Sequence, residues 1–382
     1  MTNTYDYIIV GAGCAGLSLL MRILDEPALH EKKILLIDRV PKKQNDRTWC
    51  FWEKGKGYFE PVVHHQWQQL FVKHPDGEKN LDLGGYAYKM IRSEDFYRFC
   101  FERINRAANV QVMFGEVSGI DAGKGTVAFN SSIYTAEKIF SSVLLNPPKL
   151  HTGEWYLLQH FRGWVIETDE DFFDPAAADL MNFRTSQEHG CAFLYMLPVS
   201  KRRALVEYTL FTEKELSSDQ YDKGLRDFIS GELRLPAYRI AETEQGVIPM
   251  TNIVFKPGEG KVTFLGTAGG QTKASTGYTF QFIQQHAEKI TASLLNHQPV
   301  KAYPARFRFY DSVLLRILAE QKLKGADVFY RMFCKNKAWK VLKFLDNQTH
   351  LLQELSIMQS TRKAFFIPAA LSELRNLKKV NI

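Results

Sequence analysis

Residues 5–24 read YDYIIVGAGCAGLSLLMRIL, and residues 33–38 read KILLID. YDYIIV (5–10) is a short run rich in β-branched residues, as expected of a buried strand, and LSLLMRIL (17–24) has the spacing of a helix that packs on one apolar side. KILLID is a second apolar run, and it ends in an acid. A strand, a helix and a strand in so short a segment predict a βαβ unit whose two strands are parallel.

The turn after the first strand carries glycines at the spacing of a dinucleotide-binding loop, GAGCAG (11–16). Gly11 would make the tight turn, Gly13 would let the backbone approach a pyrophosphate, and Gly16 would let helix and strand pack closely. Asp38 follows Gly16 by 22 residues and would accept a hydrogen bond from a ribose hydroxyl, while the helix N-terminus faces the phosphates. A glycine-rich turn that binds nothing is the alternative. The predicted cofactor contacts here are Gly11, Ala12, Gly13, Ala15, Gly16 and Asp38.

A second glycine-rich turn favours FAD as the dinucleotide. VTFL (262–265) predicts another strand, GTAGGQTKASTG (266–277) follows it, and a helix is expected from about 276 to 295. Two loops that close on one ligand suit a long, extended cofactor, and their backbone N–H groups would face the pyrophosphate or the flavin ring. A loop whose glycines serve only the turn is the alternative. The predicted contacts are Gly266, Gly269 and Gly270.

Arg92 is a further candidate for cofactor binding. It precedes SEDFYRFCFERINRAA (93–108), whose acids in the first turn and apolar spacing predict a helix. Arg92 resembles the arginine that many flavoproteins place before their second helix. A solvated arginine at a helix start is the alternative.

The rest of the chain departs from the nucleotide-binding pattern twice. Two clear strands at 192–198 and 204–211 mark a β-rich stretch, and from residue 301 onward the pattern is helical. We therefore predict an α/β fold that has a Rossmann-type FAD-binding domain, an inserted β-rich substrate domain and a helical C-terminal section. The predicted boundaries are 1–150 and 251–300 for the two parts of the FAD-binding domain, 151–250 for the insertion and 301–382 for the helical section.

Positive charge is concentrated at the C-terminal end of the chain. The net charge is +7, and residues 301–382 carry 16 Lys and Arg against 6 Asp and Glu. Such a section predicts an anionic partner, either a membrane or a nucleic acid. Between residues 307 and 345, basic side chains are interleaved with aromatic and aliphatic ones at helical spacing, which favours an amphipathic helix in the membrane interface over a nucleic-acid surface. A core-packed helical section with a basic outer face is the alternative.

Composition excludes several classes of protein. With 45% apolar and 24% charged residues, the chain has the balance of a folded globular protein. The five cysteines show no C-x-x-C spacing and the histidines no metal-ligand spacing, so neither a disulfide framework nor a metal site is expected; His64, His65 and His160 are predicted to be ordinary surface or turn residues. No apolar run reaches the roughly 20 residues of a membrane span, and the first residues lack the features of a signal peptide. We expect a cytoplasmic protein attached peripherally to the inner face of the cell membrane.

Six stretches are specific enough to indicate a family: GAGCAGLSL (11–19), DRTWCFW (46–52), FLYMLPVS (193–200), ALVEYTLF (204–211), EQGVIPM (244–250) and GTAGGQTKASTGYTF (266–280). Together they resemble the lycopene cyclase family, flavoproteins that close the ends of linear carotenoids. They occur in the order found in the family, and the combination of VEYT with GTAGG is the most particular. The resemblance implies conversion of lycopene, or of the half-cyclised gamma-carotene, to β-rings without net oxidation. It also implies FAD that works in its reduced form, with NAD(P)H as the reductant.

Glu207 is the catalytic acid that the resemblance implies. Plant members carry two adjacent glutamates, whereas this chain has Val206, Glu207 and Tyr208, so the first plant glutamate has no counterpart. Cyclisation begins when an alkene is protonated. Because an alkene is a very poor base, the acid must be neutral and poorly solvated, and burial raises the pKa of a carboxyl group accordingly. A strand glutamate that points into solvent is the alternative. The residues expected on the same face of the strand are Leu205, Thr209 and Phe211.

A carbocation also needs stabilisation by groups that do not trap it. Aromatic faces supply ~0.5–2 kcal/mol per contact, and an anionic reduced flavin supplies more because it carries a full charge. The aromatic candidates are Trp49, Phe51, Trp52, Tyr195, Tyr208 and Tyr278.

Two other functions are compatible with the sequence. The same scaffold serves flavin-dependent NAD(P)H oxidoreductases, such as aromatic hydroxylases and isoprenoid reductases. A flavin-binding sensor without catalysis fits if Glu207 has no role. Consumption of NAD(P)H separates a hydroxylase or reductase, which uses it stoichiometrically, from a cyclase, which does not.

Overall fold

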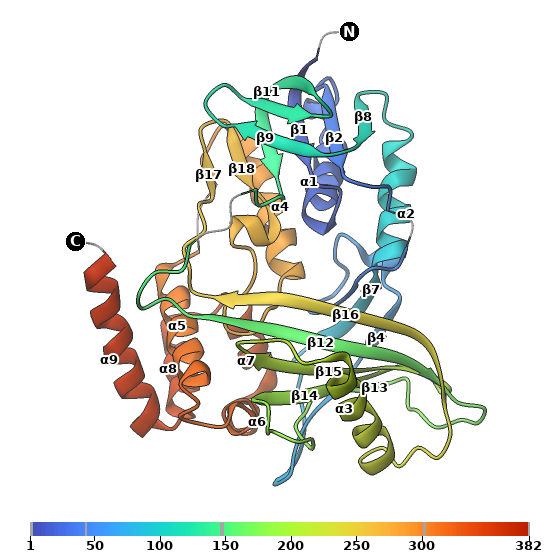
Figure 1. The fold of residues 1–382 in the computed structure, drawn as a ribbon, viewed down its shortest axis with the longest axis vertical. Helices are drawn as coiled ribbons and strands as arrows, with labels where there is room; N and C mark the ends of the chain where they lie inside the picture. The colour runs from blue at the N-terminus through green and yellow to red at the C-terminus, as the bar shows by residue number, and fades with distance from the viewer. Residues whose placement is uncertain (1–2, 43, 146–148, 301–302, 381–382) are drawn as a thin grey trace.

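Three β-sheets organise the chain in the computed structural model, which describes residues 3–42, 44–145, 149–300 and 303–380. Figure 1 shows the eight-stranded sheet at the top, the seven-stranded sheet below it, and the C-terminal helices beside the lower sheet. This arrangement confirms the predicted α/β fold with a Rossmann-type part, further sheet structure and a helical C-terminal section. The smallest sheet has the order β3-β7-β4, with β3 (Thr48–Lys54), β7 (Tyr86–Arg92) and β4 (His65–Trp67).

The eight-stranded sheet contains the predicted βαβ unit. β1 (Thr4–Val10) lies between β2 (Ile34–Asp38) and β11 (Ser132–Ser141) and is parallel to both. α1 (Cys14–Asp25) connects β1 to β2. The other strands are β8 (Val110–Phe114), β9 (Val117–Asp121), β10 (Thr126–Phe129), β17 (Gly258–Glu259) and β18 (Val262–Phe264); the helices that pack with α1 on one face are α2 (Ser93–Ile104) and α4 (Phe280–Asn296).

Strand alternation places apolar side chains on both faces of this sheet. Ile9 and Leu36 pack against the helices, whereas Ile8 and Leu35 pack on the opposite face with Phe129 of β10. Both faces of β1 and β2 are therefore buried, which is why these strands read as continuous apolar runs.

The seven-stranded sheet has the order β16-β12-β15-β14-β13-β5-β6, and its neighbouring strands are antiparallel except β13 and β5. β5 and β6 come from the segment predicted as the first part of the FAD-binding domain, yet they extend the sheet of the predicted insertion. The domain boundaries stay predictions, and this sheet takes strands from both sides of residue 150. Its strands are β5 (Gln69–His74), β6 (Gly77–Asn80), β12 (Tyr156–Glu167), β13 (Ala177–Asn182), β14 (Cys191–Ser200), β15 (Arg203–Thr212) and β16 (Arg239–Thr251).

Different layers cover the two faces of the seven-stranded sheet. On one face, Val206, Tyr208 and Leu210 of β15 pack against α3 (Ser218–Gly231). On the other face, Leu205 and Phe211 pack in a core shared with the three-stranded sheet and the C-terminal helices, which we call the interlayer core. The alternation predicted for residues 204–211 is confirmed.

The described part of the C-terminal section is helical, as predicted. Phe307, Phe329 and Phe333 are each 1% exposed, because these helices pack against the sheets. The predicted interfacial helix over residues 307–345 is therefore wrong, and the core-packed alternative holds there. Within the described residues, no helix is long and apolar enough to cross a membrane. The helices are α5 (Ala305–Ala319), α6 (Gly325–Lys335), α7 (Ala338–Leu345), α8 (Leu351–Gln359) and α9 (Lys363–Val380).

Candidate active site

The first glycine-rich loop has the geometry that a phosphate-binding turn requires. Gly11 has φ +104°, a region that favours glycine, and a Cβ placed there would lie 2.1 Å from Ser142 Oγ. A Cβ on Gly16 would lie 2.0 Å from the Gly11 carbonyl oxygen, so the helix packs against the turn only with glycine. At Gly13 the corresponding Cβ would have no atom within 4 Å. Gly11 and Gly16 thus serve the fold, and Gly13 leaves space for a ligand.

The start of α1 adds an electrostatic preference to this loop. α1 begins directly after Gly13, with no capping side chain and no acid in its first turn, so the positive end of the helix dipole stays available to an anion. Asp38 Oδ2 accepts a hydrogen bond from the Ala12 N–H at 2.6 Å, and Oδ1 accepts one from the Val40 N–H at 3.3 Å. Asp38 therefore orders the loop, and its contact with a ribose stays a prediction.

The second glycine-rich loop lies against the first. Gly266 (φ +58°) begins the short helix η3 (Gly266–Gly269), and a Cβ on it would lie 3.1 Å from Ala15 Cβ in α1. Gly270 has φ +74°, and a Cβ on Gly269 would lie 2.3 Å from the backbone of β18, so the turn itself requires both glycines. An uncapped helix, an open glycine and a second loop at the same place fit a dinucleotide such as FAD.

Arg92 ends β7 at the N-terminus of α2 and forms an ion pair with Glu94 in the first turn of that helix. Its register partner on β3 is Thr48, whose side chain donates a hydrogen bond to Glu244. Arg92 therefore belongs to the strand pair that borders the carboxyl groups described next. Its contact with the cofactor stays a prediction.

Glu207 meets a second glutamate across a single glycine. Glu207 on β15 and Glu244 on β16 are both register partners of Gly163 on the intervening strand β12. A Cβ on Gly163 would lie 3.0 Å from Glu244 Cγ and 3.0 Å from Leu205 Cδ1. The missing side chain therefore lets the two carboxyl groups approach one another above β12 and form a hydrogen bond.

Each carboxyl group also has a hydroxyl donor. Thr209 Oγ1 donates to Glu207 Oε1 at 2.8 Å, and Thr48 Oγ1 donates to Glu244 Oε2 at 2.7 Å. Burial raises the pKa of Glu207 well above its ordinary value and Glu244 raises it further, whereas the bond from Thr209 lowers it. Burial also raises the pKa of Glu244, but its bonds from Thr48 and Glu207 and the charge of Arg47 oppose the rise. The pKa of both carboxyl groups is therefore raised, and the opposing contributions at Glu244 favour Glu207 as the group that holds a proton.

Aromatic side chains surround this pair. Tyr195 is the direct partner of Glu207 on β14, and its hydroxyl interacts with that of Tyr278. Trp52 packs edge-on against Tyr278, with ring centroids 4.6 Å apart. Tyr88 approaches from the three-stranded sheet. Burial raises the pKa of its hydroxyl, and neighbouring groups, among them Glu207, raise it further. Aromatic side chains thus lie beside Glu207, and the faces of aromatic rings stabilise positive charge.

Strand alternation removes three of the six aromatic candidates. Trp49 and Phe51 point from the other face of β3 toward α2 and α4. Tyr208 lies on the far face of the seven-stranded sheet, beside α3. These three predictions are wrong, because neighbouring residues on a strand face opposite sides. The candidates that face the interlayer core, as Glu207 does, are Trp52, Tyr195 and Tyr278, and Tyr195 is the register partner of Glu207.

Glu244, Tyr88 and Cys50 are site residues that the sequence pattern does not reveal. The Cys50 thiol is held neutral, since burial raises its pKa well above the ordinary value and the two glutamates raise it further. Glu244 opens EQGVIPM (244–250), one of the stretches that carry the family resemblance. That stretch is the single sequence signal that marks it.

His160 differs from its predicted surface position. It lies on β12 and is fully buried; its Nε2 is 2.7 Å from Thr212 Oγ1 and its Nδ1 is 2.6 Å from the Tyr221 hydroxyl. Burial lowers the pKa of His160 to about 4, so the ring is neutral. It faces α3, away from Glu207. Among the residues that the structure describes, no group of three or more His, Cys, Asp or Glu could hold a metal ion.

A buried polar cluster ties the second loop to the C-terminal helices. Lys273 Nζ lies 2.8 Å from Asp311 Oδ1 on α5 and donates to Asn347 Oδ1 at 2.7 Å. Trp52 Nε1 donates to Asp346 Oδ2 at 2.6 Å, just beyond α7. Burial raises the pKa of Asp346 to about 7, although Trp52 and Lys273 oppose the rise. The cluster holds Trp52 and the second loop in place.

Solved structures similar to this chain share its fold. A geranylgeranyl bacteriochlorophyll reductase-like protein from Thermoplasma acidophilum is 12% identical with a TM-score of 0.59, covering 99% of this chain and 100% of that one. A flavoprotein/dehydrogenase from Cytophaga hutchinsonii is 9% identical with a TM-score of 0.61, covering 98% of this chain and 100% of that one. At these identities the likeness establishes the fold alone.

The sequence comparisons identify the family. A family model described as lycopene cyclase protein matches residues 6–373. The lycopene beta-cyclase of Pantoea ananas is 24% identical over 314 residues, which are 76% of this chain and 75% of that protein. The lycopene beta-cyclase of Pseudescherichia vulneris is 23% identical over 258 residues, 64% of this chain and 62% of that protein. Since the family model covers nearly the whole chain, the chain belongs to the lycopene cyclase family.

Proposed function

We propose that this chain converts the linear ends of lycopene, or of gamma-carotene, to β-ionone rings. The observation that carries this function is the half-buried Glu207, which faces a second carboxyl group and lies beside aromatic side chains. An alkene is protonated only by a neutral acid in a poorly solvated place, and the pKa of Glu207 is raised in that direction by burial and by Glu244. The related lycopene beta-cyclases support the same substrate class.

In the proposed reaction, Glu207 transfers its proton to C2 of the carotenoid end group. Thr209 occupies Oε1, which leaves Oε2 as the oxygen that carries the proton. The C5=C6 electrons then form a bond to the cationic C1, and C6 loses a proton to the carboxylate pair of Glu207 and Glu244. The pair begins and ends the cycle with one proton, no electrons are gained or lost, and the carotenoid is isomerised.

The positive charge moves through the end group while the ring forms. Trp52, Tyr88, Tyr195 and Tyr278 would stabilise it through their ring faces, by ~0.5–2 kcal/mol per contact, and none of these faces is a strong nucleophile. FAD held by the loops at 11–16 and 266–270, reduced by NAD(P)H, would supply a negative charge that stabilises the cation without net redox chemistry.

A flavin-dependent NAD(P)H oxidoreductase is the second candidate function. A probable FAD-dependent monooxygenase from Pseudomonas aeruginosa is 12% identical with a TM-score of 0.55, covering 93% of this chain and 100% of that one. That likeness concerns the scaffold. Hydroxylation by a flavin does not need the carboxyl pair of Glu207 and Glu244, whereas cyclisation needs a proton donor. We therefore favour the cyclase.

Isotope incorporation and reductant use separate the two functions. We expect wild-type protein with chemically reduced FAD in D₂O to place about one deuterium at C2 of each new ring, because the proton comes from an exchangeable acid. NAD(P)H should be consumed only in the initial reduction of the flavin. Mass spectrometry of the pigment and the absorbance of NAD(P)H measure both quantities. Stoichiometric NAD(P)H use per product would instead support the oxidoreductase.

Glu244 should set the pH range in which Glu207 stays protonated. Activity requires protonated Glu207, so it is lost as pH rises through the pKa of that group. Glu244→Gln removes a neighbouring negative charge that raises this pKa, and we expect the alkaline limb of the pH–rate profile to move to lower pH. Glu213→Gln, at an exposed position after β15, should leave the profile unchanged. If the alkaline limb of Glu244→Gln stays in place or moves to higher pH, Glu244 does not raise the pKa of the catalytic acid.

We also propose that the protein works at the inner face of the cell membrane as a peripheral protein. Lycopene is almost insoluble in water, so the enzyme must take it from a bilayer. The positive charge of residues 301–382 supports attraction to anionic headgroups.

A further inference from the structure

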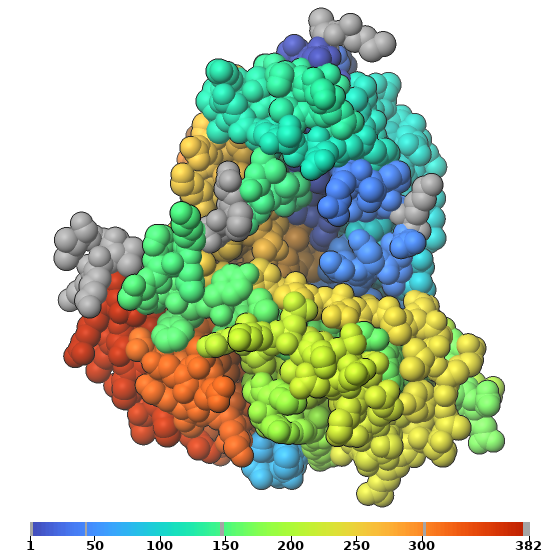
Figure 2. All heavy atoms as spheres, in the orientation of Figure 1, coloured from blue at the N-terminus to red at the C-terminus, as the bar shows by residue number. Residues whose placement is uncertain are grey.

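Exposed apolar side chains gather on the last two helices. Leu352 on α8 is 75% exposed and Leu371 on α9 is 53% exposed, values far above those of the core. Spacings of three and four residues place the exposed side chains of α9 on one side of that helix. Figure 2 shows these helices, in orange and red, at an outer corner of the molecule. The α8–α9 face consists of Leu351, Leu352, Leu355, Ile367, Leu371 and Leu374.

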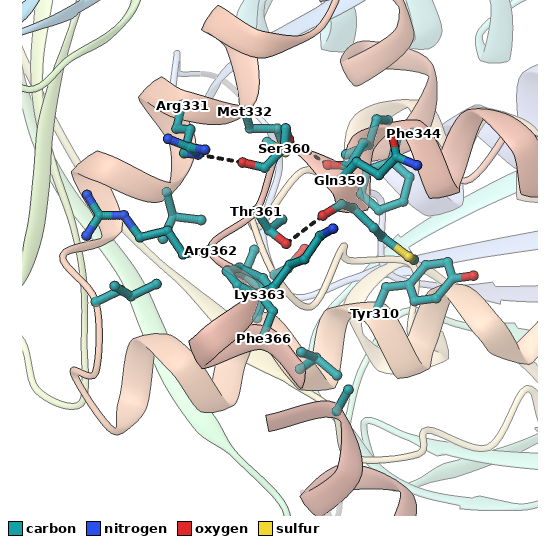
Figure 3. Close-up of a pocket in the computed structure, with 18 of the residues that line it drawn as sticks. Tyr310, Arg331, Met332, Phe344, Gln359, Ser360, Thr361, Arg362, Lys363 and Phe366 are labelled. Carbon is teal, nitrogen blue, oxygen red and sulfur yellow. Dashed lines mark hydrogen bonds between the residues drawn. The ribbon is translucent and has the colours of Figure 1, made fainter. Parts of the chain in front are cut away.

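A cavity of about 390 Å³ lies behind this face (Figure 3). Its walls come from all five C-terminal helices, with Val313 of α5, Met332 of α6 and Phe366 of α9 among them. Leu355 and Ile367 belong both to the lining of the cavity and to the exposed face. The cavity therefore opens between α8 and α9, where the apolar surface is continuous with its interior.

The inner end of the cavity reaches the second glycine-rich loop. Ser275 and Asp311 line it, and Ser275 Oγ donates to Asp311 Oδ1 at 2.7 Å. Ser275 belongs to the second glycine-rich loop, and Tyr278, three residues further on, interacts with Tyr195, the register partner of Glu207. An apolar chain in the cavity would thus extend from the protein surface to this loop.

Cationic side chains lie at the rim of the cavity. Arg331 Nε donates to the Ser360 carbonyl oxygen at 2.6 Å, and Arg362 lies 3.7 Å from Asp327 (Figure 3). Lys363, the first residue of α9, is exposed beside them. An apolar face with cations at its edge matches the interface of a bilayer that contains anionic lipids, where side chains enter the acyl region and cations stay with the headgroups.

We propose that the α8–α9 face docks on an anionic bilayer and that the cavity takes up one hydrocarbon chain from it. The identity of that chain as a linear carotenoid rests on the proposed function. The docking itself rests on the exposed face, the rim cations and the opening between the two helices.

Vesicles without carotenoid test the docking surface. The double variant Leu352→Ser/Leu371→Ser should bind vesicles of phosphatidylcholine and phosphatidylglycerol about 10- to 100-fold more weakly than wild type, because two apolar side chains are lost from the contact. The matched control Ile133→Ser/Val254→Ser changes residues that are 57% and 58% exposed elsewhere, and it should bind like wild type. Binding should also weaken with salt, since screening shortens the electrostatic range to ~3 Å at 1 M.

Equal binding by the α8–α9 variant and wild type would overturn the docking surface. So would self-association of wild type through this face, seen by analytical ultracentrifugation, without vesicle binding. Salt-independent binding to pure phosphatidylcholine would overturn the role of the cations.

A larger side chain tests the cavity. Ala370→Phe adds bulk to the lining on α9, and we expect about tenfold weaker binding of a fluorescent fatty acid and a similar fall in turnover of vesicle-borne lycopene, with vesicle binding intact. The exposed Ala364→Phe on the same helix should change neither. Unchanged probe binding in Ala370→Phe would overturn the cavity as a chain site. Intact docking and probe binding without ring formation would instead contradict the proposed function alone.

Discussion

Glu207→Gln leaves the chain folded and able to bind FAD but removes ring formation. Glutamine has nearly the volume of glutamate, Thr209 still donates to its Oε1, and its amide group donates to Glu244. It cannot deliver a proton, and general acid catalysis alone contributes ~10²–10⁴-fold. We expect a loss of at least this size, because an alkene is a very poor base and the amide cannot replace the acid. Pigment analysis in cells that accumulate lycopene measures ring formation, and absorbance of the purified protein measures FAD.

Two further variants separate the proton from the shape of the side chain. Glu207→Asp keeps an acid on a shorter stem and should retain part of the activity that glutamine abolishes. Glu213→Gln removes an exposed carboxyl group just beyond the same strand and should cyclise at the wild-type rate. Near-normal ring formation by Glu207→Gln would show that another group supplies the proton.

Gly13→Val should abolish FAD binding while the protein still folds. Gly13 has φ −87°, which valine adopts, and a Cβ there meets no protein atom within 4 Å. The new side chain would instead occupy the space through which a pyrophosphate approaches the helix N-terminus. Loss of one charge-assisted hydrogen bond costs about 1.5–3 kcal/mol, or roughly 10- to 100-fold in affinity, and steric overlap adds to it. Flavin absorbance and the melting temperature of the apoprotein are the measurements.

Gly16→Val is the contrasting variant in the same loop. Its Cβ would lie 2.0 Å from the Gly11 carbonyl oxygen, so we expect a loss of folded protein as well as of flavin. The difference between the two glycines distinguishes a ligand contact from a packing requirement. A flavin-loaded, yellow Gly13→Val protein would remove this loop from the cofactor site.

The predictable parts of this molecule are those determined by nearby residues. The βαβ unit follows from apolar runs, a glycine spacing and an acid within residues 5–38. The direction of Glu207 follows from alternation along a single strand. Both inferences need only the periodicity of side chains along a helix or a strand, and the local sequence shows that periodicity.

The missed parts depend on contacts between distant segments. Glu244 joins Glu207 only because β12 lies between β15 and β16 and carries glycine at the meeting point. His160 is buried because Tyr221 of α3 covers that face of the sheet. Aromatic residues at helical spacing fit a core as well as a membrane surface, and only the sheets that residues 307–345 cover decide between the two.

The hydrogen bond between Trp52 and Asp346 joins residues 294 positions apart, and the interlayer core around it takes side chains from both ends of that span. On the ribosome, Trp52 and the strand of Glu207 emerge long before α7. The nascent chain therefore holds an unfinished apolar surface through most of its synthesis. Contacts of such high sequence separation form slowly, and chaperones have that interval in which to act.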